Sequence, residues 1–306
     1  MALRIATFNL KDFFLPRNAT EQAVGVQKIA NVAASLRRAN ADVVALQEVG
    51  GAEILDRLVA EVKDLSYGPP VLGTEDKRGI RNAILSRLPV QWSQVHTAKS
   101  LPFPPLVEGD PDPYAGRIPL RRGIVHVRVD AGALGEVDVL TAHFKSNLPA
   151  LLKGAAGKEV PDTNVHMAGQ SAIRSLVQRA AEALFVRGLV DEVFAKSPDH
   201  AICVLGDLND TPTSLPVRLV RGLDATHRHH LRAAGEDMPA ERRFSSFHGG
   251  APILIDHILC SDRLHRALTS FEIHNEALRY HGPYVEGEVE LTVDSDHALN
   301  VAEFAG

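Results

Sequence analysis

Cysteine, aromatic residues and long apolar runs are all scarce in this chain of 306 residues. Two cysteines cannot form a disulfide framework for a chain of this length, which excludes the small disulfide-rich folds. Cys203 and Cys260 both lie in apolar, strand-like runs, so we expect buried free thiols. No apolar run approaches the ~18 residues of a membrane-spanning helix, so we expect no membrane partner.

The chain also lacks a strong charge of either sign. It has 33 Lys and Arg against 38 Asp and Glu, a net charge of −5, and 45% of its residues are hydrophobic. That balance excludes a disordered chain and is typical of a soluble globular protein. The N-terminal residues carry no long apolar core followed by a small-residue cleavage site. We therefore expect a cytoplasmic protein, or a secreted one if the sequence is a trimmed mature form.

Strand-like and helix-like segments alternate along the chain. Apolar patterns predict strands at 3–10, 42–46, 82–86, 123–129, 136–142, 202–205, 253–259 and 298–304. Helices are predicted after the capping pair Asn18 and Glu21, at 52–63, and at about 165–194. One face of the last helix carries Ile173, Val177, Ala180 and Leu184, which predicts the face that packs on the core. Residues 98–120 and 147–164 are predicted loops.

No linker rich in proline, glycine or serine divides the sequence. We therefore expect one domain over residues 1–306 in which sheets are covered by helices, an α/β fold. Positive charge is concentrated in one part of it, because residues 77–128 hold nine Lys and Arg against three acids. That segment is either a solvated face or a wall that faces phosphates.

Polar side chains recur at the ends of the predicted apolar strands. Carboxylates, amides and imidazoles stand there together: Asn9, Glu48, His143, Asp207, Asn209, Asp256, Asp296 and His297. Any one of them alone is more often a turn or capping residue. Together they suit a hard, oxygen-ligated cation such as Mg²⁺ beside general acid–base groups.

These motifs resemble the endonuclease/exonuclease/phosphatase superfamily, and they follow the order of that family along nearly the whole chain. The matching segments are FNL at 8–10, DVVALQEV at 42–49, NAILSR at 82–87, TAHFKSN at 141–147, VLGDLND at 204–210, LIDHIL at 254–259 and SDHALNVAEF at 295–304. The resemblance implies a four-layer sandwich of two facing, mostly antiparallel β-sheets flanked by helices. It is closest in style to bacterial nuclease-like members.

The resemblance also implies roles. Asn9, Glu48 and Asp296 would hold Mg²⁺ or Mn²⁺, with Glu48 as the principal carboxylate. The catalytic group would be His143, Asp207, Asn209, Asp256 and His297. In it Asp207 acts on the attacking water, Asn209 contacts a phosphate oxygen, and Asp256 fixes the tautomer of His297. Arg81 and Lys145 are candidate phosphate contacts.

The expected activity is that of a divalent-metal-dependent phosphodiesterase, an endo- or exonuclease that hydrolyses DNA or RNA by in-line attack of water. The alternatives are a phosphatase or phosphodiesterase for a small or lipid phosphate ester, and a non-catalytic scaffold of the same fold. Departures from two subgroups favour the nuclease. His143 stands where abasic-site endonucleases usually have Tyr, and Ile255-Asp256-His257 departs from the Cys-Asp-Arg of inositol phosphatases. No acid near 78–82 is evident as a partner for His143, and the oligomeric state stays open.

Overall fold

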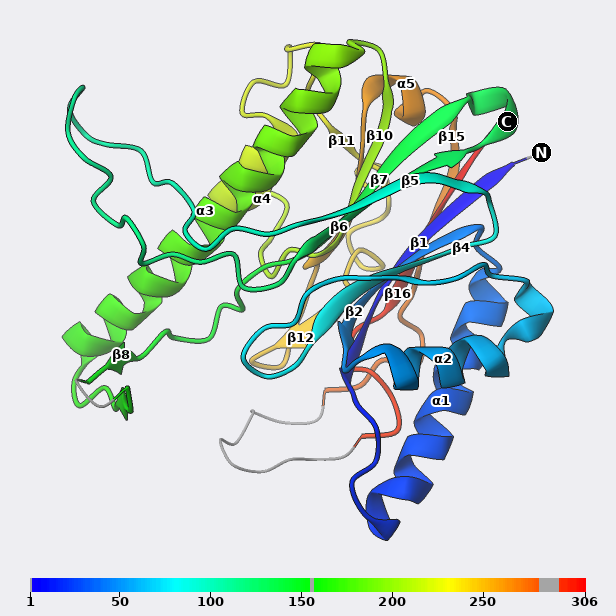
Figure 1. The fold of residues 1–306 in the computed structure, drawn as a ribbon, viewed down its shortest axis with the longest axis horizontal. Coiled ribbons are helices and arrows are strands. Elements are labelled where there is room, and N and C mark those ends of the chain that lie inside the picture. The colour runs from blue at the N-terminus through cyan, green and yellow to red at the C-terminus, as the bar shows by residue number, and fades with distance from the viewer. Residues whose placement is uncertain (1, 155–156, 281–291) are drawn as a thin grey trace.

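Two six-stranded sheets form the centre of the molecule (Figure 1), seen in a computed structural model that describes residues 2–154, 157–280 and 292–306. The first sheet consists, in spatial order, of β15 (Leu268–His274), β16 (Leu299–Phe304), β1 (Leu3–Phe13), β2 (Val43–Val49), β4 (Arg81–Ser86) and β3 (Val71–Leu72). Its one parallel pair is β1 with β2, and the other neighbours are antiparallel.

The second sheet has the same plan. In spatial order it consists of β11 (Arg232–Ala233), β14 (Asp256–Cys260), β10 (Ala201–Asp207), β7 (Glu136–His143), β6 (Ile124–Asp130) and β5 (Val90–His96). Here β7 and β10 form the one parallel pair. The predicted strands are thus found with small shifts, except that residues 253–259 divide between β13 (Ala251–Ile253) and β14.

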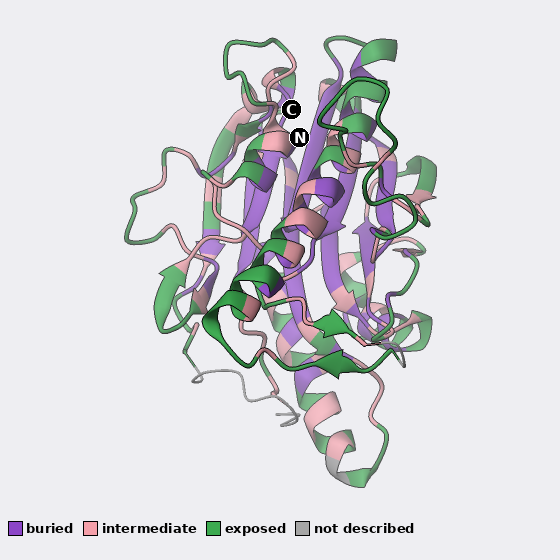
Figure 2. Cartoon of the chain, turned by 90° about the vertical axis from the view of Figure 1, so that its left-hand side faces the viewer, coloured by how far each residue is buried: buried purple, intermediate pink, exposed green. Residues whose placement is uncertain are grey.

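Helices cover the outer face of each sheet, so the molecule has four layers. Apolar residues of α1 (Ala19–Ala39) and α2 (Ala52–Glu61) pack on the first sheet, and those of α3 (Val165–Lys196) and α4 (Leu215–Arg221) pack on the second. A third core cluster, including Ile5, Val43, Val139 and Cys203, fills the space between the sheets. This layering confirms the predicted α/β sandwich, and Figure 2 shows its buried strands lying behind α3.

Two local predictions from the sequence are confirmed. The Asn18 side chain accepts a hydrogen bond from the Glu21 backbone N–H, which satisfies a donor that the first turn of α1 leaves free. Cys203 and Cys260 are buried free thiols on adjacent strands. The short elements α5 (Asp262–His265), β12 (Ser246–His248), β8 (Leu152–Lys153) and β9 (Glu159–Val160) complete the chain, the last two inside a predicted loop.

The predicted packing face of α3 is wrong at two of its four positions. Ile173 is 62% exposed and Leu184 is 37% exposed, whereas Val177 packs on a core cluster and Ser171, Ser175 and Arg179 are buried in the N-terminal half. The physical reason is that this half of the helix lies against a polar loop, where Ser175 Oγ donates to the carbonyl oxygens of residues 146 and 148. Among the described residues, no helix is long and apolar enough to cross a membrane.

Candidate active site

The two parallel strand pairs bring four polar side chains to one rim. Asn9 lies late in β1 and Glu48 late in β2, whereas His143 and Asp207 end β7 and β10 side by side. Parallel strands end at the same edge of a sheet, so Asn9 and Glu48 lie at one edge of the first sheet, and His143 and Asp207 lie at one edge of the second. A hydrogen bond joins the two facing sheets there, as Asn9 Nδ2 donates to Asp207 Oδ2 over 3.0 Å.

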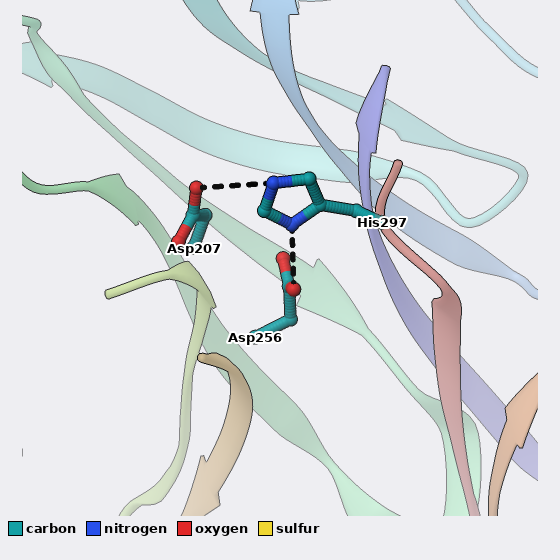
Figure 3. Close-up of side chains that lie close together, drawn as sticks. All are labelled: Asp207, Asp256 and His297. Atoms are coloured by element: carbon teal, nitrogen blue, oxygen red, sulfur yellow. Dashed lines mark hydrogen bonds and ion pairs between the residues drawn. The ribbon is translucent and has the colours of Figure 1, made fainter. Parts of the chain in front are cut away.

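Asp256 and His297 add an imidazole–carboxylate pair to this rim. His297 Nδ1 lies 2.8 Å from Asp256 Oδ2, and Nε2 of the same ring lies 3.9 Å from Asp207 Oδ2 (Figure 3). Asp256 is fully buried at the start of β14. A carboxylate only accepts hydrogen bonds, so Asp256 fixes the proton on Nδ1 and leaves Nε2 facing Asp207.

Charge and burial act against each other at this pair. Burial lowers the pKa of His297, but the charges of Asp256 and Asp207 outweigh it and hold that pKa well above its usual value. Burial raises the pKa of Asp207, and the nearby charge of Asp256 adds to the rise. A positively charged ring therefore lies beside a carboxylate that is held close to protonation, which suits proton transfer.

Asp207 is fixed by amide donors. Its Oδ1 accepts from the backbone N–H of Asn209 at 2.9 Å, and its Oδ2 accepts from Asn209 Nδ2 at 3.0 Å. The Asn209 amide also donates to the carbonyl of Phe144, so the protein already engages its two N–H groups. In this conformation Asn209 orients Asp207.

His143 is the second imidazole of the site. Its Nε2 lies 3.4 Å from Asp207 Oδ2 and 3.8 Å from Glu48 Oε1. Burial, followed by the charge of Arg122, holds the pKa of His143 well below its usual value. Its buried Nδ1 has no hydrogen-bond partner among the residues described, in agreement with the missing acid noted in the sequence.

Backbone strain gathers at the same rim. Lys11, Asp12, Glu48 and Asn209 all adopt left-handed conformations, with φ values of 47°, 47°, 61° and 54°. Such conformations disfavour side chains other than glycine, and they persist where the surrounding structure enforces them, often at functional sites. The turn after Asn9 and the bulge at Glu48 thus position these side chains at a cost in local stability.

Glu48 and Asp296 keep oxygen atoms for a cation. Glu48 Oε2 accepts from the backbone N–H of Asp12, whereas Oε1 accepts no hydrogen bond in the described part of the chain. Asp296 Oδ2 lies 3.2 Å from Lys11 Nζ, and its Oδ1 lies 3.9 Å from His297 Nε2. The amide oxygen of Asn9 accepts from the backbone N–H of Lys11. Carboxylate and amide oxygens are donors that Mg²⁺ or Mn²⁺ favours, so the chemistry of these residues fits such an ion.

A second group also has metal-ligating chemistry. Ligand atoms of Asp207, Asp256 and His297 lie within 4.8 Å of one another. The hydrogen bond of 2.8 Å between Asp256 and His297 already uses two of these groups, so we treat the three as the proton-handling part of the site.

Arg81 and Lys145 lie at the site with their donors engaged by protein. The Arg81 guanidinium pairs with Glu75 and donates to the carbonyls of Gly50 and Gly79. The Lys145 ammonium donates to Ser146 and to the carbonyl of Leu148.

The basic segment 77–128 is largely neutralised in the same way. Five of its nine cations have carboxylate partners: Arg78, Arg81, Arg87, Arg122 and Arg128. The segment is therefore not a continuous wall of free charge. Of the four cations without an ion pair in the part of the chain that the structure describes, Lys77, Lys99 and Arg117 are exposed, whereas Arg121 is half-buried. Burial, and then the charge of Arg122, lowers the pKa of Arg121.

Sequence reasoning missed two serines that hold the site together. Ser295 Oγ donates to the carbonyl of Asn9 and accepts from the backbone N–H of His297. Ser245 Oγ accepts from the backbone N–H of Asp256. Ser295 directly precedes the Asp-His pair, and that position is the sequence signal that could have identified it. No sequence signal pointed to Ser245, because its contact depends on the loop before β12.

The fold and this rim define a class of enzyme that hydrolyses phosphate esters. The sequence model of the endonuclease/exonuclease/phosphatase family matches residues 6–297, and the chain belongs to that family. Enzymes of this family are typically dependent on divalent metal ions. No curated protein matches the sequence significantly.

Solved structures share the fold at low identity. Truncated TDP2 from Caenorhabditis elegans is 18% identical with a TM-score of 0.60, covering 100% of this chain and 98% of that one. The 3′ phosphatase NExo from Neisseria, bound to a product DNA hairpin, is 19% identical with a TM-score of 0.58, covering 99% and 100%. An AP endonuclease from Archaeoglobus fulgidus is 15% identical with a TM-score of 0.56, covering 99% of each chain.

Proposed function

We propose that the protein is a divalent-metal-dependent phosphodiesterase that hydrolyses nucleic acid. The observation that carries this proposal is the convergence of Asp256, His297 and Asp207 with the half-free carboxylates of Glu48 and Asp296 at one rim. It supplies a base, a cationic acid and an oxygen-rich cation site within one cluster, as hydrolysis of a phosphate ester requires.

Each residue has a role that follows from its contacts. Asp207, whose pKa burial raises, orients the attacking water and accepts its proton as the new bond from oxygen to phosphorus forms. The His297 ring, kept positively charged by Asp256, donates a hydrogen bond from Nε2 to a phosphate oxygen on which negative charge develops. Neutral His143 contributes a second ring N–H near the same oxygen of Asp207 that His297 faces.

Glu48, Asp296 and Asn9 are the residues that would hold the ion. When bound, a divalent cation supplies Lewis-acid stabilisation of the phosphate oxygens. Lys11 Nζ lies 3.2 Å from Asp296 Oδ2, so the lysine ammonium neutralises part of the same negative cluster. Lys28 is buried nearby, where burial lowers its pKa, and its ammonium donates to the carbonyl of Lys11.

Arg121 is the cation best suited to contact a substrate phosphate. Its guanidinium is half-buried without a carboxylate partner among the described residues, and its charge acts on both His143 and Lys145 at the edge of the site. A guanidinium matches the geometry of a phosphate group and stays charged. Arg121 therefore extends the site beyond the scissile bond, in support of a diester with a continuing backbone.

Two structural neighbours support nucleic acid as the substrate class. One is an AP endonuclease, and the other is a 3′ phosphatase bound to a product DNA hairpin. The second neighbour also supports the alternative that the chain removes a terminal phosphate monoester. These two activities differ in the number of ester bonds on the phosphate, so simple substrates separate them.

A substrate panel tests the proposal. Plasmid DNA, RNA, bis-p-nitrophenyl phosphate and p-nitrophenyl phosphate are each incubated with Mg²⁺, Mn²⁺ or EDTA. We expect cleavage of DNA or RNA and of the diester with metal, none with EDTA, and inhibition by salt as counterions compete for the backbone. Faster turnover of the monoester, with no cleavage of DNA or RNA, would favour the phosphatase instead.

A further inference from the structure

A second group of titratable side chains lies away from the active site, on the outer face of the second sheet. His96, His126 and Asp138 come from the adjacent strands β5, β6 and β7, and His200 directly precedes β10. His96, His126 and His200 border a cavity of about 590 Å³ whose other wall is the C-terminal end of α3, including Glu192. In Figure 1 these strands run beneath that end of the helix.

This group is separate from the catalytic rim. Asp138 lies near the start of β7, whereas His143 ends that strand five residues later. At a rise of 3.3–3.4 Å per residue, the two positions are about 17 Å apart along the strand. None of the groups that border this cavity belongs to the proposed hydrolytic mechanism.

Hydrogen bonds fix the tautomer of the central ring. His126 Nε2 lies 3.0 Å from Asp138 Oδ1, and because a carboxylate only accepts, Nε2 carries the ring proton. Asp138 Oδ2 in turn lies 2.8 Å from an Arg128 guanidinium nitrogen and 2.6 Å from His200 Nε2. With its proton on Nε2, His126 presents Nδ1 as the ligand atom, in the carboxylate–histidine arrangement that orients imidazole ligands of metals.

The lone pair of His126 points at a second imidazole nitrogen. His126 Nδ1 and His96 Nε2 are 3.2 Å apart. Two imidazole nitrogens bound tetrahedrally to one zinc ion at 2.0–2.1 Å are separated by about 3.3 Å. The His96 ring is free to carry its proton on Nδ1, since that atom has no hydrogen-bond partner within the described ranges.

We propose that His96 Nε2 and His126 Nδ1 bind a borderline transition-metal ion such as Zn²⁺, with Asp138 orienting His126 from behind. Glu192 borders the same cavity, but in the described part of the chain no third His, Cys, Asp or Glu has a ligand atom within 4.8 Å of both nitrogens, so water would complete the coordination. The ligands are nitrogen-rich, whereas the catalytic rim offers oxygens, so the two sites differ in the metals they favour.

Trp92 provides a local reporter for this test. It is the only tryptophan of the chain, and its ring lies edge-on to His126 with the centroids 4.9 Å apart. The full-length protein, stripped of metal with EDTA and exchanged into buffer, is titrated with Cu²⁺, the strongest binder of the divalent series. We expect saturable quenching of Trp92 fluorescence that excess Zn²⁺ reverses.

Two variants make the readout specific. His96→Gln removes one ligand from an edge strand, and we expect its apparent dissociation constant for Cu²⁺ to rise at least about tenfold, in the range seen when metal-site partners are lost. His229→Gln is the matched control, because it removes an imidazole from a different loop that contains His227. Equal quenching in the two variants, or no saturable quenching in the wild type, would overturn the proposal.

A spectroscopic measurement covers the case in which His96→Gln fails to fold, as judged by circular dichroism. Electron paramagnetic resonance of the one-equivalent Cu²⁺ form is recorded in a background with both His143→Gln and His297→Gln, where neither active-site imidazole can contribute. Nitrogen couplings from two imidazoles are the expected result. A spectrum with only oxygen ligands would contradict the proposal, and His96 would then serve only as a hydrogen-bond donor to His126.

Discussion

Replacing Asp256 with asparagine perturbs the centre of the proposed mechanism while keeping the size of the side chain. Asp256 Oδ2 accepts the ring proton of His297 at 2.8 Å, and Oδ1 is buried without a hydrogen-bond partner among the residues described. An asparagine whose oxygen faces His297 buries an unpaired NH₂ group where Oδ1 lay. One whose NH₂ faces His297 forces the other tautomer of the ring.

The two orientations have different costs. The first leaves a buried donor unsatisfied, which costs about 1–3 kcal/mol of stability. The second presents the wrong nitrogen to the phosphate, and by analogy with other histidine–aspartate pairs the rate falls by roughly 10²–10⁴. At about 1.36 kcal/mol per factor of ten, that loss is about 3–5 kcal/mol of transition-state stabilisation. Asp256 also supplies the largest favourable charge on His297, so we expect the pKa of His297 to fall in the variant.

A double-mutant cycle with His297→Ala tests the pairing. Hydrolysis of bis-p-nitrophenyl phosphate is measured for the wild type, both single variants and the double variant, at saturating metal. Because the two residues act as one unit, we expect the double variant to lose little more than His297→Ala alone. Asp262→Asn, at an exposed pair with Arg266, is the control and should keep full activity. Losses that multiply fully would refute the paired mechanism.

Two further predictions concern Arg121 and Asp138. Arg121→Gln should raise KM for an oligonucleotide more than for bis-p-nitrophenyl phosphate and reduce the salt dependence of cleavage, as initial-rate kinetics over a salt series will measure. Asp138→Asn should lower the free energy of unfolding by about 1–3 kcal/mol at pH 7, because asparagine offers one acceptor oxygen where the buried rings of His126 and His200 now have two. Burial alone would raise the pKa of Asp138, but hydrogen bonds from His126, His200 and Arg128 lower it. That stabilisation is present above the unfolded value of ~3.9 and is lost as pH falls, so urea titrations should show the deficit shrinking below about pH 4.

The site was predictable where each signal is local. An apolar run that ends in a polar residue marks a strand end, and this pattern identified Asn9, Glu48, His143 and Asp207, which the structure brings to one rim. The same pattern marked Asp256 and His297, and the resemblance added their pairing, which joins positions 41 residues apart. The catalytic and metal-binding roles of these residues, the single domain and the cytoplasmic location stay predictions.

The rest depends on contacts between distant parts of the chain. Charge counting over residues 77–128 could not show that Arg78 pairs with Asp12 or that Arg122 pairs with buried Asp76. Helical periodicity placed Ile173 on a packing face. Periodicity detects an apolar stripe on a helix, but it does not show whether another part of the chain covers that stripe. The pair His96 and His126 is created by the cross-strand register of β5 and β6, to which neither sequence segment alone points.

Glu48 provides the most direct test of a metal-dependent phosphodiesterase. Hydrolysis of bis-p-nitrophenyl phosphate is measured against Mg²⁺ concentration for the wild type, Glu48→Gln and the control Glu53→Gln, whose exposed side chain pairs with Arg57 on α2. Glu48→Gln keeps the shape of the side chain but removes the charge that would hold the cation. We predict a loss of orders of magnitude in rate for Glu48→Gln with an unchanged circular dichroism spectrum, and full activity for Glu53→Gln. Hydrolysis by folded Glu48→Gln at the wild-type rate and with the same Mg²⁺ dependence would contradict the account.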